Sequence, residues 1–155
     1  MGGDTEVPDP GSLLRRFGFE QAANVLTRRQ AEVLVLREQG LRQSTIAEIL
    51  GTSRANVSSV ESSARENIAK AEATVSFAAA IAAPVQVQVD RGTDLYEVPT
   101  MVFDACDAAG VKVSRTAPEV LHLVTDAAGD AVDGRLVTDE FVIDVTPEGR
   151  LQIRV

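Results

Sequence analysis

The pattern of apolar residues between residues 26 and 83 predicts α-helices, and from Val57 to Ala82 apolar residues recur every three or four positions. The first of these helices has clear ends within residues 26–40, LTRRQAEVLVLREQG. Thr27 followed by Gln30 forms a capping-box pattern at its start, and Gly40 is a typical stop just beyond its last turn. Before it, residues 13–25 predict a short helix that is interrupted near Gly18.

Residues 43–62, QSTIAEILGTSRANVSSVES, have the pattern of a helix-turn-helix. Ala47 stands where a larger side chain would collide with the second helix, and Gly51 stands where the turn requires a positive φ. Val57 and Val60, with Ile46 and Leu50, would hold the two helices over a small shared core. A glycine turn between two helices also occurs in bundles that never touch DNA, but four size-restricted positions in register favour the DNA-binding motif. The weakest point of the match is Arg42, which stands where Ser or Thr usually opens the first helix of the motif.

The second helix of the motif is predicted to continue to Ala82 or Ala83, where Pro84 ends it. Its apolar positions follow a narrow stripe: Val57, Val60, Ala64, Ile68, Ala71, Val75, Ala78 and Ala82. One interpretation is that the stripe packs on the chain's own domains. The other, which the sequence favours, is a stalk at which two copies dimerise, because helix-turn-helix proteins commonly bind paired half-sites.

After residue 84 the period changes, and the pattern predicts a small domain of strands and helices in the order β-α-β-α-β-β. We expect a strand at VQVQV (85–89), a short extended piece at LYEV (95–98) and a second strand at VKVS (111–114). Helices are expected over 99–109 and from Pro118 over EVLHLVTDAA. A terminal hairpin is expected from 136–145 and 150–155, joined by TPEG.

The predicted fold class is therefore α+β: an N-terminal all-α helix-turn-helix domain, a long connecting helix and a small C-terminal α+β domain. Residues 1–12, rich in Gly, Pro and acidic side chains, predict a disordered arm. Residues 13–83 would form the DNA-binding domain with its extended recognition helix, and residues 84–155 the C-terminal domain for dimerisation or sensing.

Charge is distributed unevenly along these regions. Residues 13–75 hold nine Arg or Lys and seven Asp or Glu, whereas residues 76–155 hold six and thirteen. The overall net charge of −8 thus originates outside the predicted DNA-binding region. Only two basic residues are Lys, which together with the acidity suggests a halophilic, salt-accumulating source, although high genomic GC content would also favour Arg. With no long apolar run and no signal-peptide pattern, we expect a cytoplasmic protein without a membrane partner.

The outward face of the second motif helix carries the candidate DNA contacts. Arg54 can bind guanine O6 and N7 with two hydrogen bonds, and Ala55 can touch a thymine methyl group. Thr52 or Ser53 would cap the helix, whose first amides would face a phosphate. The predicted DNA-binding residues are Thr52, Ser53, Arg54, Ala55, Asn56, Ser58, Ser59 and Ser62. For each single serine, a merely solvated surface position is an equally good interpretation.

The leading helix and motif together resemble the sigma-factor promoter-binding domain and the effector domain of many response regulators. The segments TSRANVSSVESSARENIAKAEATVSFA and GTDLYEVPTMVFDACDAAGVKV are, as a pair, similar to the archaeal Tfx family of DNA-binding transcriptional regulators. The resemblance covers about residues 25–155. It implies an archaeal source, a DNA-binding head and a family-specific C-terminal domain, and it supplies no catalytic or ligand residue for that domain.

The sequence predicts no enzyme, no metal and no cofactor. His122 is the only histidine and has no partner at metal-ligand spacing, so a surface or half-buried position is expected. Asp126, Asp130 and Asp133 lack the alternating spacing of a calcium loop. Cys106 is the only cysteine and is expected to be a small buried residue.

Two functions fit these observations. In the first, the chain is a sequence-specific regulator of double-stranded DNA, a homodimer whose C-terminal domain dimerises or senses an unknown small ligand. In the second, it is a sigma-like adaptor that docks on the transcription machinery mainly through protein contacts.

Overall fold

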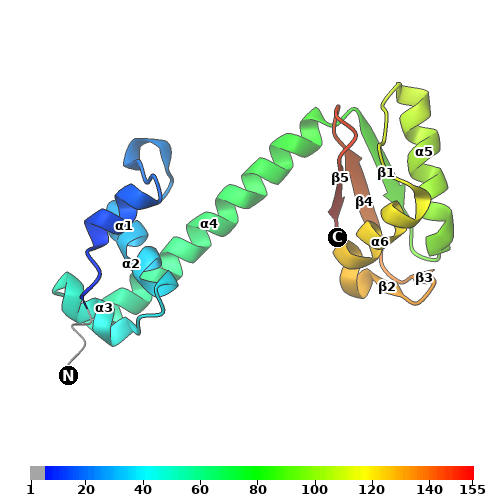
Figure 1. The fold of residues 1–155 in the computed structure, drawn as a ribbon. Coiled ribbons are helices and arrows are strands. Elements are labelled where there is room, and N and C mark those ends of the chain that lie inside the picture. The colour runs from blue at the N-terminus through cyan, green and yellow to red at the C-terminus, as the bar shows by residue number, and fades with distance from the viewer. Residues whose placement is uncertain (1–5) are drawn as a thin grey trace. The chain divides into compact units, whose positions relative to one another are not determined.

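The computed structural model describes residues 6–155, which divide into two compact units (Figure 1). The head unit extends to Val75, and the C-terminal unit comprises Ser76–Val155. Helix α4, Arg54–Ala82, contributes residues to both. The observed class is the predicted α+β, with helices alone in the head and a small sheet in the C-terminal unit.

The head unit begins with α1 (Pro10–Arg16), the 3-10 turn η1 (Gln21–Ala23) and α2 (Arg28–Glu38). The predicted capping box is present, because the Thr27 side chain accepts from the Gln30 N–H while the Gln30 side chain accepts from the Thr27 N–H. Helix α3 (Gln43–Leu50) ends at Gly51, whose φ of 68° is left-handed as the turn requires. The helix-turn-helix geometry expected from the sequence is therefore confirmed.

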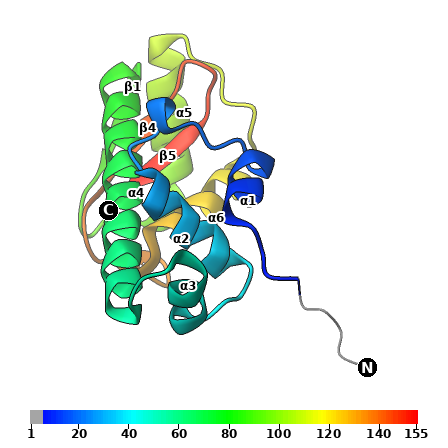
Figure 2. The ribbon, with the colours of Figure 1, turned by 90° about the vertical axis from the view of Figure 1, so that its left-hand side faces the viewer.

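The head's core lies where α2, α3 and α4 meet. Figure 2 shows α2 and α3 beside the first turns of α4. The fully buried side chains of this core come from all three helices: Val33, Leu36, Ile46, Ala47 and Val57. Because each helix contributes only one or two of them, small changes in side-chain size should disturb the angle between the helices.

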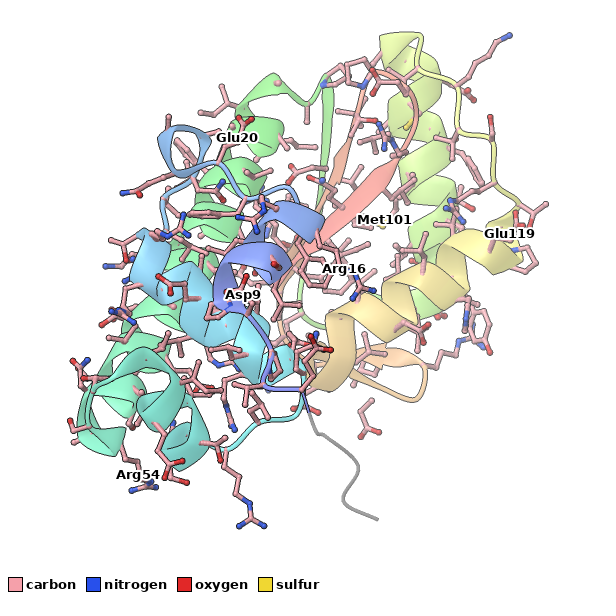
Figure 3. All side chains as sticks on the ribbon, turned by 60° about the vertical axis from the view of Figure 1, so that its left-hand side comes forward. Asp9, Arg16, Glu20, Arg54, Met101 and Glu119 are labelled. Carbon is pink, nitrogen blue, oxygen red and sulfur yellow. The ribbon has the colours of Figure 1, made fainter. Side chains whose placement is uncertain are left out.

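The start of the chain differs from the prediction. The expected disordered arm covered residues 1–12, of which 1–5 lie outside the described residues and 10–12 are helical. The Asp9 side chain caps α1 by accepting from the Ser12 N–H, and Pro10 occupies the first turn, where its missing N–H has no consequence. These capping signals outweigh the Gly- and Pro-rich composition. Figure 3 labels Asp9 at this end of α1.

Helix α4 runs without Gly or Pro to Ala82, as predicted. The apolar stripe, however, is not uniform. Val57 and Ala64 are buried, whereas Val75 is 69% exposed. The first part of the stripe is thus used inside the head, and only its last turns remain free to contact anything else.

The C-terminal unit is built on a three-stranded antiparallel sheet in the order β1-β4-β5: β1 (Val85–Val89), β4 (Phe141–Val145) and β5 (Leu151–Arg154). Helices α5 (Val98–Ala109) and α6 (Ala117–Ala128) cover one face, which buries Val87, Phe141 and Ile143 among others. On the opposite face Gln86, Gln88 and Gln152 are exposed. The strand predicted at 85–89 and both helices are confirmed.

Three elements of the C-terminal unit were predicted wrongly. The piece at 95–98 is a 3-10 turn, η2 (Leu95–Glu97), opened by the Asp94 side chain, rather than extended chain. The segment 111–114 is not a strand, because the Val111 N–H donates to the Cys106 carbonyl and so completes the end of α5. Its alternating valines instead pack at the edge of the core.

The third error concerns the terminal hairpin. β4 and β5 form it as expected, but β3 (Leu136–Val137) pairs instead with β2 (Val132–Asp133), which follows the turn η3 (Gly129–Ala131). The order is therefore β-α-α-β-β-β-β.

No helix within residues 6–155 is long and apolar enough to cross a membrane.

Candidate DNA-binding surface

The start of α4 is fixed by its own polar side chains. Ser53 Oγ accepts the Asn56 N–H at 3.1 Å, and Asn56 Nδ2 donates to Thr52 Oγ1 at 2.9 Å. Ser53 is thus the N-cap, one of the two candidates from the sequence. Asn56 keeps its amide oxygen and one amide hydrogen for an external partner.

The predicted contact residues share one side of the helix. With 3.6 residues per turn, Ala55, Ser59 and Ser62 lie on the face turned away from Val57 and Ala64, and Arg54 and Ser58 lie beside that face. Thr52 is half-buried, and the other seven predicted residues are exposed. Figure 3 shows Arg54 projecting from the head. The structure therefore brings the predicted residues together on an accessible surface.

A basic hollow adjoins this surface, lined by Arg37, Arg42, Gln43, Ser44 and Arg54. The N-terminus of α3 opens into it, and Arg42 leaves the first amides of that helix without a side-chain cap. Uncapped amides at a helix start and nearby guanidinium groups both favour an anion. In the sequence Arg42 looked like a missing cap, and in the structure it leaves the first amides of α3 free to bind an anion.

Glu61 holds α2, α3 and α4 together, and sequence patterns did not reveal it. Its side chain accepts from Arg37 Nε at 3.0 Å, Gln43 Nε2 at 3.0 Å and Arg65 Nη2 at 3.0 Å. Arg37 also donates to the Leu41 carbonyl. This buried carboxylate thus fixes two side chains that line the basic hollow, Arg37 and Gln43.

The head should lose stability in acid through Glu61. Burial by itself raises the pKa of this carboxyl, but the hydrogen bonds from Gln43, Arg37 and Arg65 outweigh burial and hold the pKa below its ordinary value of 4.5. The resulting stabilisation is complete above the unfolded-state pKa and is lost as the pH falls through the folded-state pKa. Chemical denaturation at a series of pH values between neutrality and strong acid measures it.

The matched variants are Glu61→Gln and Glu66→Gln. Glu61→Gln should cost about 1–2 kcal/mol at neutral pH, since both arginines are partly solvated and can rehydrate. Glu66 is exposed and pairs only with Lys70, so its substitution should change little. Equal effects of the two variants would show that the Glu61 contacts do not stabilise the head.

No metal-binding group is found in the part of the chain that the structure describes. Residues 6–155 contain no group of three His, Cys, Asp or Glu side chains able to hold a metal ion. His122 is exposed and lies 3.3 Å from Asp126 on the next turn of α6, the surface position expected. Cys106 is buried, as expected, and burial, with a smaller contribution from Asp107, raises the pKa of its thiol.

Comparison with known proteins assigns both units. The family model described as "DNA_binding protein, TFX, C-term" matches residues 71–153, more than half of the chain. The chain belongs to the Tfx family. A second model, for region 4 of sigma-70, matches residues 22–70, which contain α2, α3 and the first part of α4.

Relatives in the Tfx family match along almost the whole chain. A "Putative transcriptional regulatory protein" of Haloarcula marismortui is 50% identical over 146 residues, covering 94% of this chain and 92% of that protein. One of the same description from Methanocaldococcus jannaschii is 40% identical over 128 residues, covering 83% and 93%. The "DNA-binding protein Tfx" of Methanothermobacter thermautotrophicus is 34% identical over 126 residues, covering 81% and 91%. The Tfx family is one of DNA-binding transcriptional regulators, which fits a helix-turn-helix with an accessible second helix.

Proposed function

We propose that the protein binds specific sites on double-stranded DNA as a homodimer, with the first turns of α4 in the major groove, and so regulates transcription. The observation that carries the proposal is the exposed face of α4 from Arg54 to Ser62, continuous through Arg54 with the basic hollow at the start of α3. A helix-turn-helix places its second helix in the groove while its first helix meets the backbone. The two surfaces have the chemistry that each position requires.

Within the groove, Arg54 is the side chain best suited to base discrimination, because its guanidinium can reach O6 and N7 of one guanine together. Ser58, Ser59 and Ser62 are short and allow the helix to approach closely, with contacts to phosphates or through water. Ala55 offers a methyl group to thymine. The start of α4 would be positioned on the DNA backbone by three side chains. These are the N-cap Ser53 and the hydrogen-bonded pair Asn56 and Thr52.

Arg54→Ala should weaken binding to the cognate site by about 1–3 kcal/mol and leave thermal stability nearly unchanged. The Arg54 side chain is exposed and makes no ion pair with the described residues. The expected loss of binding free energy therefore comes from its contact with DNA alone. Titration of cognate and base-substituted duplexes at fixed salt measures the effect. Specificity should fall together with affinity.

Arg42→Ala is the matched control, because it removes an arginine from the same hollow. Arg42 stands at the start of α3, the helix proposed to meet the DNA backbone. It should weaken binding to all sequences about equally and reduce the salt dependence. If wild type and Arg54→Ala bind the cognate duplex with equal affinity, Arg54 takes no part in base recognition.

A second candidate function is the sigma-like adaptor. It is favoured by an apolar hollow on the head, lined by Phe17, Leu34, Val35 and Glu38, in which the Phe17 side chain is largely exposed. Such a surface suits a protein contact on the transcription machinery. A gel-shift experiment with random competitor DNA separates the two functions, since only the sequence-specific regulator requires strong site preference.

Two further expectations stay predictions. A small ligand of the C-terminal unit gains little support, because the hollow at Gly92, Asp94, Arg135 and Leu136 is shallow and its Asp94 and Arg135 are already paired. The halophilic source rests on the acidic, Lys-poor composition.

A further inference from the structure

The end of α4 is apolar on all sides. Residues 73–89 contain no charged side chain, and Val75, Phe77 and Ile81 are each about two-thirds exposed. By helix geometry Phe77 lies nearly opposite Val75, and Ile81 lies next to Phe77 at the side of the stripe. A helix segment that is apolar all round is normally covered by other protein. Within the C-terminal unit, Ala80 is buried and Ala79 is half-buried, whereas the larger side chains of the helix segment are exposed.

The next element, β1, is an edge strand without the usual protection. It pairs with β4 alone, and no backbone hydrogen bond within residues 6–155 satisfies its other side. Soluble proteins blunt such edges with charged residues, prolines or bulges, and VQVQV has none of these. The opposite edge, β5, carries Arg154 and is preceded by Arg150. The unprotected edge and the apolar helix end are thus adjacent, joined by Ala83 and Pro84.

We propose that β1 pairs antiparallel with β1 of a second copy, and that Phe77 and Ile81 are covered in the same interface. The inference rests on the proposed homodimer and locates its contact. Two identical strands that pair antiparallel are related by a two-fold axis, so each supplies the same surface and the contact closes on itself. The result is a continuous six-stranded sheet.

The side chains fit a second copy better than an unrelated strand. With the axis near Val87, Gln86 lies opposite the partner subunit's Gln88, and the Gln86 amide oxygen, which has no partner within residues 6–155, can accept from the amide of that Gln88. Asp90 then lies opposite the partner subunit's Pro84, which belongs to the uncharged segment, and this avoids close contact between acidic side chains. This matters because residues 76–155 hold thirteen acidic and six basic residues.

This interface differs from the stalk expected from the sequence. The stripe from Val57 to Ala82 is partly buried inside the head, so it cannot serve as a contact along its whole length. The proposed contact uses the side of the last turns of α4 that carries Phe77 and Ile81, together with the strand edge.

The experiment compares lysine variants of the full chain by light scattering over a concentration series. Gln88→Lys places a charge on the unprotected edge, and Phe77→Lys places one on the helix end; each should weaken dimerisation by about tenfold or more. Gln152→Lys, on the other edge strand of the same sheet face, and Leu136→Lys, at another exposed apolar residue, are the controls and should stay dimeric. Gln86 is left intact because it bonds to Asp144 and the Ala80 carbonyl.

Hydrogen exchange gives a second readout on the unmodified protein. In a dimer all β1 amides should be protected, whereas in a monomer those directed away from β4 should exchange fast. The protection of the β1 amides that are directed away from β4 should therefore increase with protein concentration and decrease in Gln88→Lys.

Three outcomes would overturn the inference. If Gln88→Lys and Phe77→Lys remain dimeric, the interface lies elsewhere and the homodimer itself stands. If Gln152→Lys dissociates as readily as Gln88→Lys, the sheet face and not the edge makes the contact. A monomeric wild type would remove the homodimer as well, while binding of each variant to a single half-site shows separately whether the head recognises DNA.

Discussion

Ala47→Glu should unfold the head unit, at a cost of about 4 kcal/mol or more, which is comparable to the whole stability of a small domain. Ala47 is 5% exposed and lies in the core with Leu36, Ile46 and Val57. A glutamate there would bury a carboxylate without a partner and separate the two helices of the motif. Thermal unfolding followed by circular dichroism, with limited proteolysis to show which unit is lost, measures the effect.

Gly51 gives the companion test. Its φ is 68°, yet an added Cβ would meet no atom within 4 Å, so the penalty is conformational and does not come from crowding. Gly51→Ala should therefore cost about 1–2 kcal/mol, and the β-branched Gly51→Val should cost more and unfold the head.

A well-folded, DNA-binding Ala47→Glu protein would show that the helix-turn-helix register is wrong.

A chain cut after Val75 should bind a two-half-site operator about 10²- to 10⁴-fold more weakly than the intact protein. Val75 is the last residue of the head unit, which has its own core, so the fragment should fold. The fragment lacks the segment proposed to join two copies, and each head must then bind independently. Affinity for duplexes that contain one or two half-sites, measured at fixed salt, gives the ratio.

A duplex with a single half-site is the control, because the fragment and the intact chain should bind it about equally. Undiminished affinity of the fragment for the full operator would leave the C-terminal unit without a role in paired binding.

Local signals in the sequence predicted most of the head correctly. The capping box of α2, the left-handed Gly51 and the stop at Pro84 each depend on residues a few positions apart, and all three occur as predicted. The error at 111–114 has a different origin, since alternating apolar residues also occur where irregular chain packs on one side of a core. There Gly149 approaches so closely that its added Cβ would overlap the Lys112 carbonyl.

The candidate site was predicted in part. The exposed face of α4 follows from helical periodicity, so the positions of Arg54, Ser58 and Ser62 could be expected. The basic hollow and the Glu61 contacts could not, because they join side chains such as Arg37 and Glu61 that are 24 positions apart. Only the packing of α2 and α3 against α4 brings these groups together.

The ion pairs of the head determine how its DNA binding should respond to salt. Five of its basic residues already face carboxylates: Arg15, Arg28, Arg37, Arg65 and Lys70. Among the described residues, Arg42 and Arg54 are the arginines at the DNA-binding surface without such a partner. Because Arg54 is proposed to bind a guanine, Arg42 is the arginine of this surface left to neutralise a phosphate, and each head would release few condensed counterions. Affinity would depend on fit within the groove more than on counterion release, and would survive salt concentrations that detach a more basic head.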